Sequence, residues 1–151
     1  MAETLGSLCD KLTIVKLKQY HSEDENRLQS LHQQEGQLVE EIEEFISDAI
    51  NGLIPLNKLT FRSNKVYKQQ GNEISEIKGS IGTIFAKLAD TNCLLWHEQE
   101  KVYDFEKVVD VSAKDAVVKQ LAILNLQRTK CIDEIDNSFL ELIEFKSGSK
   151  K

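Results

Sequence analysis

Two histidines, each followed three positions later by an acidic residue, are the side chains best suited to chemistry in this sequence. They form the pairs His21 with Asp24 and His97 with Glu100. Residues three apart share one face of a helix, so each pair would place an imidazole beside a carboxylate. Helical bundles bind divalent metal ions with such pairs on facing helices, and neutral imidazole suits zinc or iron. The spacing therefore allows a metal or small-molecule site between helices.

A purely structural interpretation of these polar residues competes with the metal site. Gln34 and Gln127 interrupt two apolar helical stripes at matched positions, and buried polar residues of this kind can fix helix register. We expect the imidazoles to be partly buried and to bond to their own acids or to these glutamines. Two carboxylates make a thin ligand set for a metal ion, and acidic residues near turns also cap helices. We favour this interpretation, with no cofactor, and keep a divalent-metal or small-ligand enzyme as the alternative.

The histidine pairs belong to a longer internal repeat. The segment Thr4 to Leu12 reappears as Ser80 to Leu88, at an offset of 76 residues, and the same offset aligns Tyr20-His21 with Trp96-His97. A second segment, Leu28 to Ile46, reappears 93 residues later. The difference between the two offsets predicts a second hairpin whose arms are each about eight residues longer. At 1.5 Å per residue, its tip would protrude by about 12 Å.

Apolar residues at three- and four-residue steps along the chain predict four amphipathic helices. Thr4 is the expected cap of the first helix, and Asp24 or Asn26 the expected cap of the second. The third helix would begin near Glu73 or near Ser80, and a turn is expected near Val111. We predict an all-α, antiparallel four-helix bundle made of two duplicated αα-hairpins in a single domain. Its expected parts are a hairpin at 4–51, a crossover at 52–72, a longer hairpin at 73–146 and a mobile tail at 147–151.

Composition narrows the classes of function. The net charge of −6 argues against binding to nucleic acid, which requires clustered basic residues. No apolar run approaches the roughly 18 residues that a membrane span requires, and the first residues lack the features of a secretory signal. The three cysteines include no Cys-x-x-Cys pair and align with Phe85, Leu17 and Leu38 in the repeat, so we expect all three to pack as small apolar residues. These features predict a cytoplasmic protein without membrane insertion.

The tip of the longer hairpin is the expected interaction surface. Apolar side chains gather there beyond the reach of the shorter hairpin, and exposed patches of this kind usually mark interfaces. No phosphate-binding loop, nucleophile elbow or His-Glu-x-x-His motif is present. We therefore expect a non-catalytic interaction or assembly module, with self-association or another protein as partner. The candidate interface comprises Val102, Tyr103, Phe105, Val108, Val109, Val111, Val117 and Val118.

Several motifs resemble a family of bacterial proteins. They are Gly6-Ser7-Leu8-x-Asp10-Lys11-Leu12-Thr13-Ile14, Asn64-Lys65-Val66-Tyr67 within Pro55 to Tyr67, Asn92-x-x-Leu95-Trp96-His97, Leu124-Asn125-x-Gln127-Arg128 and Ile132-Asp133-Glu134-Ile135-Asp136. Together they span nearly the whole chain and resemble domain of unknown function family 4254. The resemblance implies a helical fold and a cytoplasmic setting. It also implies an accessory role in the synthesis of cell-surface polysaccharides, and it carries no catalytic residues.

Overall fold

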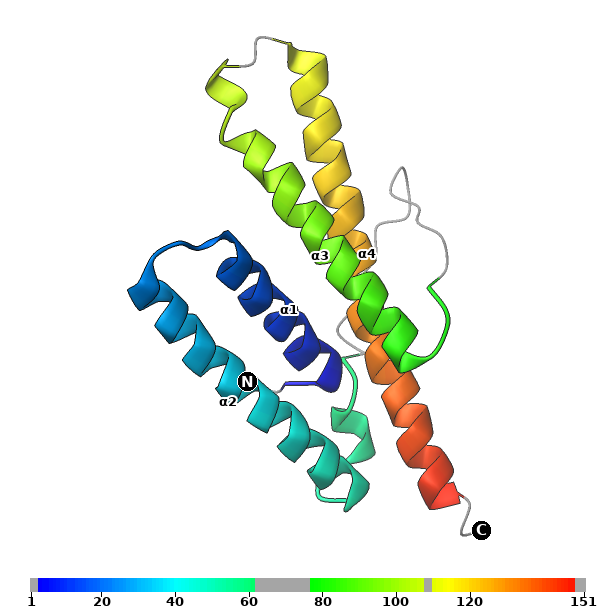
Figure 1. Ribbon diagram of the computed structural model, residues 1–151. Coiled ribbons are helices and arrows are strands. Elements are labelled where there is room, and N and C mark those ends of the chain that lie inside the picture. The colour runs from blue at the N-terminus through cyan, green and yellow to red at the C-terminus, as the bar shows by residue number, and fades with distance from the viewer. Residues whose placement is uncertain (1–2, 62–76, 108–109, 149–151) are drawn as a thin grey trace.

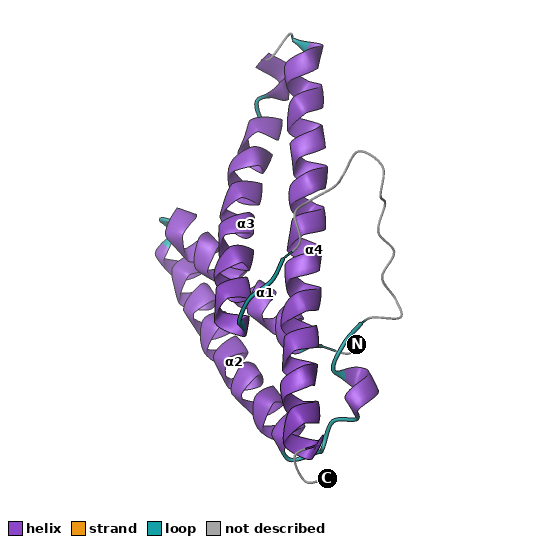
Figure 2. Cartoon of the chain, turned by 90° about the vertical axis from the view of Figure 1, so that its right-hand side faces the viewer, coloured by secondary structure: helices purple, strands orange, loops and turns teal. Residues whose placement is uncertain are grey.

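The computed structural model describes residues 3–61, 77–107 and 110–148, and these residues form an all-α protein. Four helices make up the fold: α1 (Leu5–His21), α2 (Glu25–Ile50), α3 (Ile81–Val102) and α4 (Val111–Gly148). Short 3₁₀ turns at Leu56–Lys58 and Phe105–Lys107 lie in the described parts of the connections. No strand occurs in the described part of the chain, as Figure 2 shows. The predicted all-α, four-helix fold is confirmed.

Local capping signals explain where the helices begin. The Thr4 hydroxyl accepts a hydrogen bond from the Ser7 N–H at 3.2 Å, and the Ser7 hydroxyl accepts one from the Thr4 N–H at 2.9 Å. Asp24 caps α2 by accepting from the Asn26 N–H at 3.0 Å, and the Ser80 side chain caps α3. Such bonds satisfy N–H groups that have no partner within the helix. The caps predicted at Thr4 and Asp24 are confirmed, and Ser80 is the correct one of the two proposed starts of the third helix.

The four helices form two hairpins, of which the second is the longer. α3 and α4 contain 22 and 38 residues, against 17 and 26 in α1 and α2. Figure 1 shows the joined ends of α3 and α4 extending well beyond the α1–α2 turn. The prediction of a longer second hairpin is confirmed, but its two helices are unequally lengthened and do not each gain about eight residues as predicted. The expected start of that hairpin at residue 73 lies outside the described residues, and α4 continues as helix through Gly148, beyond the expected start of the tail.

Helix α1 is the central element of the packing, because it contacts α2, α3 and α4. The apolar core continues from this junction toward the chain's C-terminal end, where Leu88, Cys131 and Ile135 are completely buried. α2 joins the same core through Phe45, whose ring centroid lies 6.1 Å from that of Phe139. The core thus connects the two hairpins at the base and leaves the far part of α3 and α4 projecting.

A glycine allows α1 to approach α4 at close range. The Gly6 N–H donates a hydrogen bond of 2.6 Å to Oδ1 of Asp136, and both residues are buried. A Cβ atom on Gly6 would lie 2.8 Å from that oxygen and closer still to the backbone carbonyl of Ile132. Any side chain at this position would force the helices apart. Gly82, which the repeat aligns with Gly6, has no described residue within 4 Å of the corresponding Cβ position.

Candidate functional site

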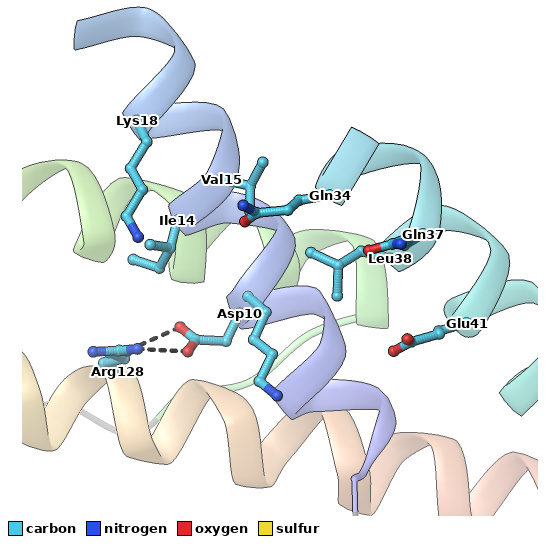
Figure 3. A pocket seen from close by; sticks show the side chains of 10 residues that line it. Asp10, Ile14, Val15, Lys18, Gln34, Gln37, Leu38, Glu41 and Arg128 are labelled. Carbon is cyan, nitrogen blue, oxygen red and sulfur yellow. Dashed lines mark hydrogen bonds and ion pairs between the residues drawn. The ribbon is translucent and has the colours of Figure 1, made fainter. Parts of the chain in front are cut away.

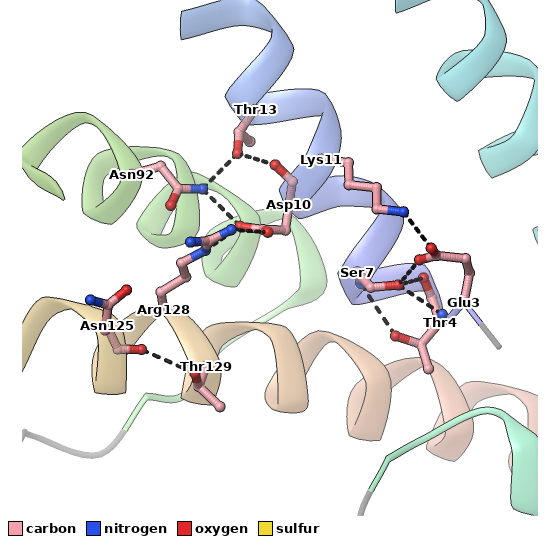
Figure 4. A network of polar contacts seen from close by, with 10 residues as sticks. All are labelled: Glu3, Thr4, Ser7, Asp10, Lys11, Thr13, Asn92, Asn125, Arg128 and Thr129. Carbon is pink, nitrogen blue, oxygen red and sulfur yellow. Dashed lines mark hydrogen bonds and ion pairs between the residues drawn. The ribbon is translucent and has the colours of Figure 1, made fainter. Parts of the chain in front are cut away.

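A partly buried ion pair lies where α1 meets α4. The Asp10 side chain accepts two hydrogen bonds from Arg128, one from Nε to Oδ1 at 2.9 Å and one from Nη2 to Oδ2 at 2.6 Å. Asp10 is 6% exposed, while a third of the Arg128 side chain (33%) remains accessible. The planar guanidinium matches the carboxylate through two parallel bonds, a geometry that gives strength and fixes orientation. Figure 4 shows the pair bridging the two helices.

Helix α3 joins this network through Asn92. The Asn92 Nδ2 group donates to Oδ1 of Asp10 at 2.9 Å and to the Thr13 hydroxyl at 2.7 Å. The Thr13 hydroxyl in turn donates to the backbone carbonyl of Asp10 at 2.7 Å. Side chains of α3 and α4 therefore converge on one carboxylate of α1, as Figure 4 shows. The Asn92 Oδ1 atom is buried and has no hydrogen-bond partner among the described residues.

The ion pair fixes the charge of its basic member. Hydrogen bonding to Asp10 raises the pKa of Arg128, and this effect outweighs the burial that lowers the pKa. The guanidinium therefore stays positively charged at every pH at which the protein is handled. Because both Asp10 oxygens accept hydrogen bonds from Arg128, the carboxylate is already occupied and is poorly placed to act as a general base.

A pocket of about 420 Å³ opens beside the ion pair, between α1 and α2. Asp10 and Arg128 form part of its wall, and Figure 3 shows the Lys18 side chain running along α1 toward them. Across the pocket, α2 contributes two amides and one carboxylate from Gln34, Gln37 and Glu41. Such a mixture of apolar wall and convergent polar groups is typical of sites for small molecules.

The predicted histidine–acid pairs lie on the surface and do not form a buried site. His21, Asp24, His97 and Glu100 are all exposed, so the expected partial burial of the imidazoles is wrong. His21 is the last residue of α1 and stacks on Trp96, with ring centroids 4.7 Å apart and planes 8° from parallel. The Asp24 carboxylate caps α2. Among the residues that the structure describes, no group of three or more His, Cys, Asp or Glu side chains is placed to hold a metal ion.

The two matched glutamines occupy different environments. Gln127 is half-buried and donates from Nε2 to the Thr91 hydroxyl at 2.7 Å. Gln34 is exposed and lines the pocket between α1 and α2. Equivalent positions in the predicted repeat therefore do not have equivalent contacts, and the two glutamines do not fix register in the same way.

The predicted interface is largely exposed where it is described. Val102, Tyr103, Val111 and Val118 are exposed, and the Tyr103 side chain reaches 87%. Phe105 and Val117 are half-buried, and the Lys114 ammonium lies 5.9 Å from the centre of the Phe105 ring. The remaining members of the predicted interface, Val108 and Val109, lie outside the described residues.

Two of the three cysteines pack as predicted. Cys9 and Cys131 are buried, whereas Cys93 is exposed, so the packing interpretation is wrong for Cys93. Burial raises the pKa of Cys9 to about 12, assisted by the charges of Asp136 and Asp10. Burial also raises the pKa of Cys131 to about 11. Because the thiolate is the reactive form, both buried thiols are inert at neutral pH.

The residues of the ion-pair network were missed as a site by reasoning from the repeat. The repeat pairs each of these residues with a different residue type, so a search for matched polar positions does not select them. The aligned pairs are Asp10 with Ala86, Asn92 with Lys16 and Arg128 with Glu35. All three nevertheless fall within the motifs that resemble the bacterial family. Their position in these motifs is the feature of the sequence that could have identified them as a site. The Asn64-to-Tyr67 motif lies outside the described residues.

Comparison with known proteins gives no match: no family model, no curated protein and no solved structure corresponds to this chain. The resemblance to domain of unknown function family 4254 therefore stays a prediction. In the described part of the chain, no helix combines the length and the apolar character needed to cross a bilayer.

Proposed function

We propose that this protein is a non-catalytic interaction and assembly module that self-associates through the tip of the α3–α4 hairpin. One observation carries the proposal: exposed apolar side chains gather at an end of the molecule that projects beyond α1 and α2 (Figure 1). Tyr103 is almost fully exposed, and Val118 is 56% exposed on the first turns of α4. Exposed apolar side chains are unfavourable in water, and a group of them at one end of a molecule favours burial against a partner.

A second copy of the chain is the partner that the tip fits best. Acidic and basic residues are interspersed with its apolar residues in the sequence, so two tips packed about a twofold axis can pair opposite charges. A tip that binds a different partner of strong net charge would instead be expected to carry charges of the opposite sign only. The charged residues concerned are Asp104, Glu106, Lys107, Asp110, Lys114, Asp115 and Lys119.

The proposed absence of catalysis rests on the state of the polar groups in the core. Both oxygens of Asp10 accept hydrogen bonds from Arg128, and the raised pKa of Cys9 keeps its thiol protonated. Neither group is prepared to accept a proton or attack a substrate. An accessory role in cytoplasmic steps of polysaccharide synthesis comes from the family resemblance alone.

Sedimentation equilibrium over a range of protein concentrations tests the proposal. We expect the wild-type chain to dimerise and Val118→Asp to shift the equilibrium to monomer, because the charge would be buried in the interface. Leu142→Asp is the matched control, since Leu142 lies on α4 away from the tip and is 57% exposed. A wild-type protein that remains monomeric at about 100 µM would refute the proposal, as would equal effects of the two substitutions.

A further inference from the structure

We propose that the pocket between α1 and α2 binds a small molecule through an oxyanion, a carboxylate or a phosphoryl group, held by Arg128 and Lys18. This ligand site is separate from the self-association proposed for the tip. The pocket lies beside the base of the α3–α4 hairpin, where α1 meets α4 (Figure 3).

Arg128 is prepared for anion binding by the bonds that it already makes. A guanidinium has five N–H donors, and Asp10 uses two of them. The other three make no hydrogen bond to a described residue, and the side chain lines the pocket with a third of its surface exposed. Because Asp10 holds the guanidinium in one orientation, little side-chain entropy would be lost when a ligand binds.

Lys18 supplies the charge that Arg128 alone cannot. The charge of Arg128 is balanced by Asp10, whereas no acidic side chain in the described part of the chain pairs with Lys18. The third basic residue of the pocket, Lys11, is paired with Glu3. With Asp10 balancing Arg128 and Glu3 balancing Lys11, the charged side chains of the lining that remain are Lys18 and Glu41. Among the described residues, Lys18 is therefore the basic group of the pocket that is available to an anionic ligand.

The rest of the pocket indicates the kind of molecule that would carry the anion. Ile14 and Leu38 provide apolar contacts, and the amides of Gln34 and Gln37 can donate to or accept from hydroxyl or carbonyl groups. A volume of about 420 Å³ lies within the range of small-molecule sites. These features fit a small carboxylated or phosphorylated metabolite with polar substituents.

Titration with sodium acetate and with inorganic phosphate, followed by amide chemical shifts in NMR, tests the proposal. Sodium chloride at matched ionic strength controls for general screening of charge. We expect saturable shifts in the part of α1 from Asp10 to Lys18, with roughly millimolar affinity for these bare probes. The probe that binds more tightly identifies the oxyanion as carboxylate or phosphoryl.

Two lysine variants show whether the chemical-shift changes come from binding in the pocket. Lys18→Gln should weaken binding roughly tenfold, since it removes a charge-assisted hydrogen bond. Lys16→Gln should bind like the wild type, because exposed Lys16 pairs with Glu35 and does not line the pocket. Both positions are on the surface of α1, so both variants are expected to fold. The proposal is overturned if neither probe gives saturable shifts, if chloride reproduces them, or if both variants weaken binding equally.

Discussion

Removal of Arg128 should destabilise the fold more when Asp10 keeps its negative charge than when Asp10 is replaced by a neutral residue. We consider Arg128→Met, which keeps an apolar chain of similar length and removes the guanidinium. Asp10 is 6% exposed in the wild type, and the substitution leaves its carboxylate with Asn92 as the remaining side-chain hydrogen-bond donor among the described residues. An uncompensated buried charge is one of the few single changes that cost several kcal/mol.

The magnitude follows from the burial of the two partners. Removing one member of a fully buried ion pair costs about 3–5 kcal/mol. Because the Arg128 side chain is 33% exposed, water can reach Asp10 after its removal, and we expect a value near 3 kcal/mol. Adding Asp10→Asn removes the buried charge and keeps an oxygen that can accept the Asn92 hydrogen bond. The double variant should therefore lie only about 1 kcal/mol below the wild type.

Urea denaturation followed by circular dichroism at neutral pH measures these free energies of unfolding. Arg27→Met is the control, because Arg27 is exposed on α2 and its replacement should change stability by less than about 0.5 kcal/mol. The reasoning is refuted if the effects of Asp10→Asn and Arg128→Met add to within about 0.5 kcal/mol in the double variant. Additivity would mean that the two side chains are not coupled.

Three further measurements test other parts of the structure. Gly6→Ala should lower the free energy of unfolding by about 2–4 kcal/mol, because the added Cβ would meet the backbone of α4. Gly82→Ala should be neutral or stabilise the protein by up to about 1 kcal/mol, because no described residue lies within 4 Å of the added Cβ. Equal effects of the two substitutions would contradict this reasoning. A thiol reagent at neutral pH should label Cys93 alone in the folded protein and all three thiols after unfolding, and mass spectrometry would show any second label on the native chain. Partial burial raises the pKa of Glu3, but the hydrogen bonds from Lys11 and Ser7 and the nearby positive charges together outweigh it and leave the pKa below its ordinary value of 4.5. The stability that Glu3 contributes is therefore present above that pH and is lost as the pH falls below it, so Glu3→Gln should reduce the loss of stability seen on acid titration.

The helices were predictable because their determinants are local. Thr4 and Asp24 act as caps through residues within three positions of themselves, and apolar spacing marks the buried face of each helix. The longer second hairpin followed from comparing two offsets in one chain. These features require no knowledge of how the hairpins pack against each other.

The site was not predictable in the same way, because it depends on contacts between distant segments. Arg128 and Asp10 are 118 residues apart, and they meet only because α1 lies against α4. The histidine pairs, in contrast, were selected by their match in the repeat. His21 is the last residue of α1, where side chains are readily exposed, so periodicity predicted its face without predicting its burial.

Stability alone is a poor explanation for the network between α1, α3 and α4. Buried ion pairs are often no better than apolar residues of similar volume, and the unbonded Asn92 oxygen carries a desolvation cost of about 1–3 kcal/mol. Natural proteins accept such costs chiefly where a site requires them. Replacing Asp10, Asn92 and Arg128 together by Leu should therefore keep or raise the stability, by up to about 4 kcal/mol, and abolish oxyanion-dependent shifts.

Denaturation and NMR titration of this triple variant separate two roles for the network. If the variant is at least as stable as the wild type and no longer responds to acetate or phosphate, the buried charges serve ligand binding. If it is less stable than the wild type by more than about 2 kcal/mol, the network contributes to holding the hairpins together and no ligand is needed to explain its presence. Leu140→Ala provides the scale for an ordinary core change, because Leu140 is buried and the substitution should cost about 2–5 kcal/mol without removing the oxyanion response.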